Sequence, residues 1–90
     1  MYRIDFTEKA KEDLAKLKKS EPNSFRKVSK LLIEIGEHPE TGTGQPEQMK
    51  HNLSGCWSRR ITGKHRIIYK ILENVVIVVI LSSYGHYEEK

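Results

Sequence analysis

The apolar run Val75–Leu81 limits the folds that this sequence can adopt. All seven of its residues are aliphatic, and six of them are valine or isoleucine. A run that is β-branched and apolar on both faces is typical of a strand covered on both sides. A membrane-spanning helix needs about 20 apolar residues, so the run is too short to be one. The sequence therefore predicts a sheet with this strand in its interior.

The 90 residues predict one small domain spanning 1–90 around that strand. Repeats, low-complexity segments and Gly/Ser/Pro linkers are absent from the sequence. The single cysteine, Cys56, cannot form an internal disulfide, and we interpret it as structural. It favours a reducing, cytoplasmic setting, and the start of the chain lacks the apolar run of a signal peptide.

Upstream of the basic part of the chain, a strand and two helices are predicted. Residues 2–6 alternate apolar and polar side chains, as a short strand does. Thr7 is the expected N-cap of the first helix, and Ser20 or Asn23 the expected N-cap of the second, which ends at Gly36 and Pro39. Both helices carry apolar residues at helical spacing, so we expect an antiparallel pair lying on a sheet.

After a loop at 40–46, three or four strands are expected. They are Met49–Leu53, Trp57–Ile61, His65–Leu72 and Val75–Leu81. In the second of these, Trp57, Arg59 and Ile61 share one face, and Ser58 and Arg60 the other. The order of elements predicts an α+β fold, with two N-terminal helices on one face of a small, mostly antiparallel sheet. The other face would be free to bind a partner.

Positive charge is concentrated between Gln48 and Lys70. This window contains six Lys or Arg and no Asp or Glu, whereas the chain as a whole carries +4, so the remainder carries −2. Such segregation indicates a binding surface for a polyanion, most often nucleic acid, rather than a merely solvated face. The cations are Lys50, Arg59, Arg60, Lys64, Arg66 and Lys70.

Glu47 and His86 are the groups near this window that could carry acid–base chemistry. Glu47 ends the loop beside cations that would contact phosphates, and His86 lies between Tyr84 and Tyr87 after the apolar strand. Each could instead be an ordinary solvated residue. Trp57 is expected to pack in the core, and the four histidines show no metal-ligand spacing.

A carboxylate, an imidazole and guanidinium groups suffice to cut RNA without a metal. The 2′-hydroxyl is an internal nucleophile, so the protein needs to remove one proton, supply another and stabilise the charge on phosphorus. Two other functions fit the same residues. One is a non-catalytic RNA- or ribosome-binding module, and the other is a protein whose basic face receives an acidic partner segment.

Four stretches of the chain form a specific pattern: GQPEQMKHNLSG at 44–55, WSRRIT at 57–62, HRIIY at 65–69 and GHY at 85–87. Together they resemble the Txe/YoeB toxins of the RelE superfamily, and the likeness covers essentially the whole chain. Such toxins are ribosome-dependent mRNA endonucleases of bacterial type II toxin–antitoxin modules, with a fold similar to small microbial ribonucleases. The resemblance thus implies cleavage of mRNA on the 70S ribosome without a metal or other cofactor. It also implies a YefM/Axe-like antitoxin and no membrane partner, and it leaves open whether the toxin forms a homodimer.

The resemblance also implies roles for individual residues. Glu47 would be the general base and His86 the general acid, while Arg66 would stabilise the transition-state phosphate and Tyr87 would position the mRNA. The predicted RNA-binding residues are Lys50, Arg59, Arg60 and Lys64, of which Lys50 and Arg59 would assist Arg66. Two features depart from the family pattern, namely Cys56 in place of an aromatic residue and the extension Glu88–Lys90.

Overall fold

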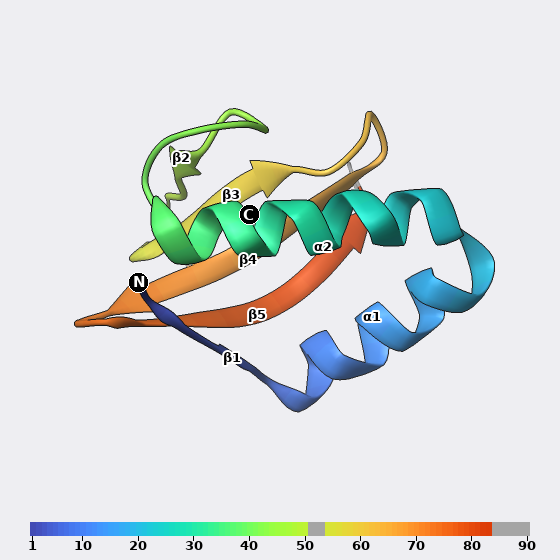
Figure 1. Ribbon diagram of the computed structural model, residues 1–90, viewed down its shortest axis with the longest axis horizontal. Helices are drawn as coiled ribbons and strands as arrows, with labels where there is room; N and C mark the ends of the chain where they lie inside the picture. Colours follow the sequence, from blue (N-terminus) through green and yellow to red (C-terminus); the bar gives the residue numbers. More distant parts are fainter. Residues whose placement is uncertain (51–53, 84–90) are drawn as a thin grey trace.

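Two helices pack on a five-stranded sheet in the order predicted (Figure 1). The computed structural model describes residues 1–50 and 54–83. The helices are α1 (Glu8–Ser20) and α2 (Pro22–Glu37), and the strands are β1 (Arg3–Phe6), β2 (Glu47–Gln48), β3 (Cys56–Arg60), β4 (His65–Leu72) and β5 (Val75–Ser83). The spatial order is β1-β5-β4-β3-β2, and among these described strands only β1 and β5 pair in parallel. The α+β prediction is confirmed.

The two helices begin in different ways, because only α1 has a side-chain hydrogen bond at its N-cap. Thr7 is the N-cap of α1, as predicted, because its hydroxyl oxygen accepts a bond of 3.0 Å from the backbone N–H of Ala10. The predicted cap of α2 is wrong. The helix α1 continues through Ser20, whose hydroxyl donates to the carbonyl of Lys16, and Glu21 forms the junction before Pro22. None of the helices in the described part of the chain is long and apolar enough to cross a membrane.

The main core lies between the helices and the sheet. Its fully buried members come from α1, α2, β4 and β5, namely Ala10, Val28, Ile35, Ile67, Tyr69, Val76 and Val78. A smaller cluster of Met49, Cys56 and Ile68 is buried separately. The structural interpretation of Cys56 is therefore confirmed, and so is the packing of Trp57, which is partly buried against the main core.

The apolar run forms an interior strand, as predicted, because β5 pairs with β1 on one side and β4 on the other. Burial on both faces is confirmed in part. Val76 and Val78 are fully buried, whereas Val75, Ile77 and Val79 stay half-buried. The register between β4 and β5 shifts between Ile68 and Tyr69, which lie opposite Ile80 and Val78, so β5 contributes one extra residue there.

The start predicted for the strand Met49–Leu53 is wrong. Pairing with β3 begins earlier, at Glu47, and the backbone N–H of Met49 donates to the carbonyl of Cys56 at 2.9 Å. Residues 51–53 lie outside the described part of the chain. The chain turns sharply before β2, because Gly44 and Gln45 both have positive φ, of 87° and 53°. The turn therefore delivers Glu47 onto the edge of the sheet rather than leaving it in a loop.

Candidate functional site

A small hollow of about 30 Å³ lies where the loop before β2 meets β3 and β4. Glu47, Ser58, Arg60 and Arg66 line it, together with Gly44 and Gln45. Ser58 and Arg60 alternate along β3 with Trp57 and Arg59, so they project to the face opposite that of Trp57 and Arg59. The side that the sequence left free for function thus carries the hollow.

The strand register brings the charged groups of the hollow together. Glu47 of β2 pairs with Ser58 of β3, and Arg60 of β3 pairs with Arg66 of β4. Because Ser58 and Arg60 are two residues apart, the three strands place one carboxylate and two guanidinium groups on one face within two residue rows. Glu47 is exposed, while Arg66 is half-buried and has its Nη1 at 3.9 Å from the sulfur of Met49.

The carbonyl of Gly44 fastens the loop to β3 beside the hollow, because it accepts a bond of 2.7 Å from the backbone N–H of Arg60. The approach is so close that a Cβ on Gly44 would lie 2.6 Å from the carbonyl oxygen of Arg60. With its positive φ, this position requires glycine. The glycine seen in the sequence motif therefore serves to position Glu47.

The other predicted site residues either do not line the hollow or lie outside the described part of the chain. Among the described residues, Lys50 and Lys64 are exposed but do not line the hollow. His86 and Tyr87 lie outside the described residues. The last described residue, Ser83, pairs with His65, directly beside the pair of Ser82 and Arg66.

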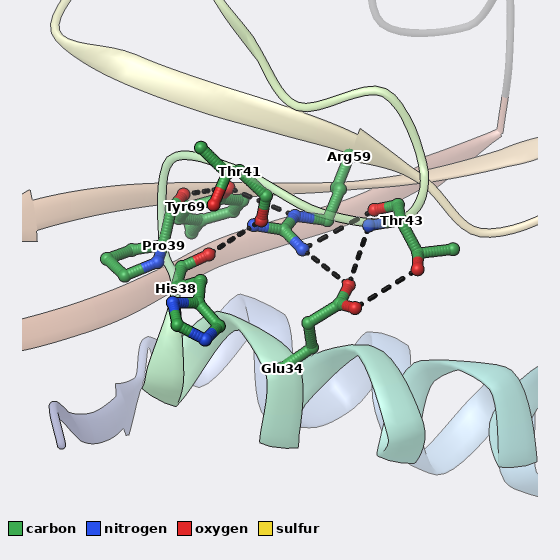
Figure 2. Close-up of polar contacts among 7 residues, drawn as sticks. All are labelled: Glu34, His38, Pro39, Thr41, Thr43, Arg59 and Tyr69. Atoms are coloured by element: carbon green, nitrogen blue, oxygen red, sulfur yellow. Dashed lines mark hydrogen bonds and ion pairs between the residues drawn. The ribbon is translucent and has the colours of Figure 1, made fainter.

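Arg59 does not contact solvent, so its predicted role in binding RNA is wrong. Its side chain is fully buried on the helix side of β3. The Nη1 group bonds Glu34 Oε1 at 2.8 Å, and Nη2 donates to the carbonyls of His38 at 2.8 Å and Thr41 at 2.9 Å (Figure 2). A guanidinium engaged in this way has no surface to offer a phosphate.

Tyr69 and Thr43 complete this cluster, which we call the Arg59 network. Its members are Glu34, His38, Pro39, Thr41, Thr43, Arg59 and Tyr69. The Nε of Arg59 donates to the hydroxyl of Tyr69 at 3.3 Å, and that hydroxyl donates to the carbonyl of Pro39 at 2.6 Å. Burial raises the pKa of Tyr69, which keeps the hydroxyl protonated as a donor.

The sequence analysis did not single out Glu34, the carboxylate of this network. The backbone N–H of Thr43 bonds one of its carboxylate oxygens at 2.8 Å, and the hydroxyl of Thr43 bonds the other at 3.0 Å. These bonds and the guanidinium of Arg59 hold the pKa of Glu34 below its usual range. A signal for the network did exist, since Arg59 shares a strand face with Trp57 and Ile61.

A second polar pair fixes the start of β4, where Arg66 lies. The Nε2 of His65 is 3.0 Å from Glu21 Oε2 at the junction between α1 and α2. The hydrogen bond from His65 holds the pKa of Glu21 below its usual range, and the hydroxyl of Ser24 adds to this effect. The residue before Arg66 is thereby tied to the helices.

The groups in the hollow suit acid–base chemistry on a phosphate. A carboxylate can accept a proton, and guanidinium groups can bind phosphate oxygens in a bidentate way. Residues 1–50 and 54–83 contain no group of three His, Cys, Asp or Glu side chains arranged to hold a metal ion.

Comparisons with known proteins agree with the fold. The family described as the YoeB-like toxin of bacterial type II toxin–antitoxin systems matches residues 6–87. A YoeB toxin of Streptomyces coelicolor is 36% identical over 77 residues, which span 86% of this chain and 92% of that protein. Solved structures from Staphylococcus aureus are also similar. A YoeB–YefM complex matches with a TM-score of 0.83 at 31% identity, over 97% of this chain and 99% of the matched chain. A YoeB dimer matches with a TM-score of 0.82 at 32% identity, over 96% and 98%.

Proposed function

Because the chain belongs to the YoeB-like toxins of bacterial type II toxin–antitoxin systems, we propose that it is a ribosome-dependent endoribonuclease that cuts mRNA and so inhibits translation. The observation that supports this most strongly is the shared hollow of Glu47, Arg60 and Arg66. A module that only binds RNA gains nothing from a carboxylate among its phosphate-binding cations. A general base, in contrast, has to lie among these cations, because the proton that it removes is next to the scissile phosphate.

The proposed reaction begins at the 2′-hydroxyl of the mRNA. Glu47 takes the proton of this hydroxyl as its oxygen attacks the adjacent phosphorus, and the bond from phosphorus to the 5′ oxygen breaks. His86 protonates that departing oxygen, and the products are a 2′,3′-cyclic phosphate and a 5′-hydroxyl. Arg66 stabilises the additional negative charge on the phosphate, with Arg60 beside it. The protons balance without a cofactor.

The position of Ser83 supports the proposed role of the tail. Ser83 pairs with His65, next to Arg66, and His86 follows three residues later. Three extended residues span at most about 10 Å, so the acid is within reach of the hollow. Tyr87 would then position the mRNA, while Lys50 and Lys64, both exposed, would bind its flanking phosphates.

We also propose two partners besides the ribosome. A YefM/Axe-like antitoxin would neutralise the nuclease, and the YoeB–YefM complex of S. aureus supports this expectation. The chain would also pair with a second copy, as the YoeB dimer of S. aureus suggests.

Primer-extension mapping of mRNA on purified ribosomes tests the proposed function. Wild-type protein should produce new 5′ ends, whereas Glu47→Gln and His86→Ala should abolish them. Lys11→Ala on α1, which removes a cation far from the hollow, should behave like wild type and serves as the control. Intact mRNA with folded wild-type protein would leave a non-catalytic binding module. Unchanged cleavage by both variants would remove Glu47 and His86 from the chemical step. Naked single-stranded RNA cut as fast as mRNA on the ribosome would contradict the dependence on the ribosome.

A modified leaving group tests the assignment of base and acid. Replacing the scissile 5′ oxygen with sulfur lets the leaving group depart without a proton. His86→Ala should then recover much of its lost rate, while Glu47→Ala should not. Equal defects of both variants on the thio substrate would remove His86 from the role of acid.

A further inference from the structure

A second depression, which we call the α2 groove, lies between α2 and the C-terminal end of β3. Its volume is about 360 Å³, within the range of small-ligand pockets, about 300–1,000 Å³. Lys27, Lys30 and Leu31 of α2 line it, with Thr43 of the loop and Arg60 and Ile61 at the end of β3. Sequence reasoning did not single out either lysine, since both lie outside the basic window.

The α2 groove combines positive walls with an apolar floor. Leu31 and Ile61 are 7% and 6% exposed, so they form part of the packed interior beneath the groove. Lys27, Lys30 and Arg60 are exposed at its walls. Glu34 also lines it, but both of its carboxylate oxygens are held by Arg59 and Thr43. The charge presented to a ligand is therefore predominantly positive.

The α2 groove adjoins the catalytic hollow. Arg60 lines both depressions, and the consecutive loop residues Thr43 and Gly44 line one each. Along α2, Lys27 and Leu31 are one helical turn apart and share a face, so the groove extends along the helix away from the hollow. A strand whose phosphate lies at Arg66 and Arg60 can thus leave the hollow over the side chain of Arg60.

We infer that the α2 groove binds one nucleotide of the RNA strand flanking the scissile phosphate. Lys27 and Lys30 would hold its phosphate, and the base would cover Leu31 and Ile61. Proteins bind single-stranded nucleic acid with cations that follow the backbone and with side chains, most often aromatic, on which the bases pack. In the α2 groove, Leu31 and Ile61 take the place of the aromatic residues. The inference rests on the proposed function, because the occupant is identified by its continuity with the hollow. An acidic peptide would match the lysines, but would not account for the wall shared with the hollow.

Binding of an uncleavable strand tests this inference. The probe is a fluorescent single-stranded RNA with 2′-O-methyl groups, measured both free and on ribosomes over a series of salt concentrations. The double variant Lys27→Ala with Lys30→Ala should raise Kd about tenfold and lower the slope of log K against log salt by about 0.7, since the two lysines hold one phosphate and each phosphate contact on a single strand contributes about 0.7. In single-turnover cleavage, it should raise the half-saturating toxin concentration about tenfold while the maximal rate changes less than twofold.

The matched control is Lys11→Ala with Lys19→Ala, which removes the same charge from exposed positions on α1. It should leave both Kd and the salt slope near wild type. Abasic nucleotides placed in turn along the probe should weaken wild-type binding at one position beside the cut site. The absence of any such position would mean that the groove contacts only the backbone, and would overturn the nucleotide subsite.

The outcomes separate the two proposals. RNA binding that depends on Lys27 and Lys30 without any cleavage would support the groove and refute the nuclease. Cleavage with RNA binding unchanged in the double variant would refute the groove alone. Loss of affinity for an acidic antitoxin peptide, with RNA binding intact, would make the groove a protein-docking site and overturn the inference. If wild-type protein bound the probe neither free nor on ribosomes, both the proposed nuclease function and the proposed subsite would be overturned.

Discussion

Arg59 and Arg66 come from the same basic window but occupy opposite environments. Arg59 is fully buried on the helix side of β3, where its guanidinium bonds Glu34 and loop carbonyls. Arg66 is half-buried on β4 and lines the hollow with Glu47. Local composition is the same for both. The face of the sheet on which each side chain projects decides whether its charge is structural or available to a ligand.

The two environments place different demands on the same side chain. A buried guanidinium is costly unless its donors are satisfied, and the Arg59 network supplies a carboxylate and carbonyl oxygens for this purpose. The same bonds from Arg59 hold the loop between α2 and β2. Glu47 follows that loop as the first residue of β2. Arg66 is half-buried, so water reaches part of its side chain. The buried arginine therefore supports the loop that places Glu47 in the hollow with Arg66.

The largest expected effect is on catalysis through Arg66. Arg66→Ala should lower the single-turnover rate by about two to four orders of magnitude, since it removes charge stabilisation of the transition state, and should hardly change the unfolding midpoint. Arg66→Lys should restore little of the rate, because an ammonium lacks the planar bidentate fork. Single-turnover rates measured at saturating toxin show whether Arg66 acts in the chemical step or in binding. Weaker binding with an intact maximal rate would make Arg66 a binding residue.

Replacing Arg59 should act on stability first. Arg59→Leu should lower the free energy of unfolding by about 3 kcal/mol, because breaking a buried ion pair typically costs 3–5 kcal/mol and Glu34, with 32% of its side chain exposed, can regain water. Urea denaturation of Arg59→Leu and Arg66→Ala, side by side, measures the difference. Equal and small losses in both variants would erase the distinction between the two arginines.

Acid should weaken the Arg59 network in a defined window. The pKa of Glu34 in the folded protein lies below 4.5, so its contribution to stability is complete above the pKa of the unfolded chain and is lost as the pH falls through the folded value. Denaturation between pH 7 and pH 3 should therefore show a steeper loss for wild type than for Glu34→Gln. Parallel curves for the two proteins would show that Glu34 titrates alike in the folded and unfolded chain.

The smallest expected effect is at Lys64, an exposed cation in the turn between β3 and β4. It belongs to neither the Arg59 network nor the hollow. Lys64→Ala should weaken RNA binding about two- to threefold and lower the salt slope by about 0.7, as expected for one phosphate contact. Binding measured at two salt concentrations, with the maximal cleavage rate as a second readout, checks this. A fall in that maximal rate would place Lys64 in the chemistry instead.

The sequence by itself determined the fold class, the two helices and the meander that follows them. Hydrophobic periodicity carries this information, because a helix and a strand need different spacings of apolar residues to bury one face. It also determined that a polyanion is the expected partner, since the separation of charge between residues 48–70 and the rest of the chain is visible without coordinates. The motif at 44–55 likewise singled out Glu47 as the candidate carboxylate without coordinates.

Only the tertiary structure decided which cation serves which purpose. Alternation placed Arg59 and Arg60 on opposite faces, but which face the helices cover depends on contacts between residues far apart in the chain, such as Arg59 with Glu34. The early start of β2 depended on the positive φ of Gly44 and Gln45, and the extra residue of β5 on its register with β4. The α2 groove likewise exists only because α2 lies beside the end of β3. Hydrophobic periodicity shows which residues share a face of one helix or strand, whereas a site forms where several helices, strands and loops meet.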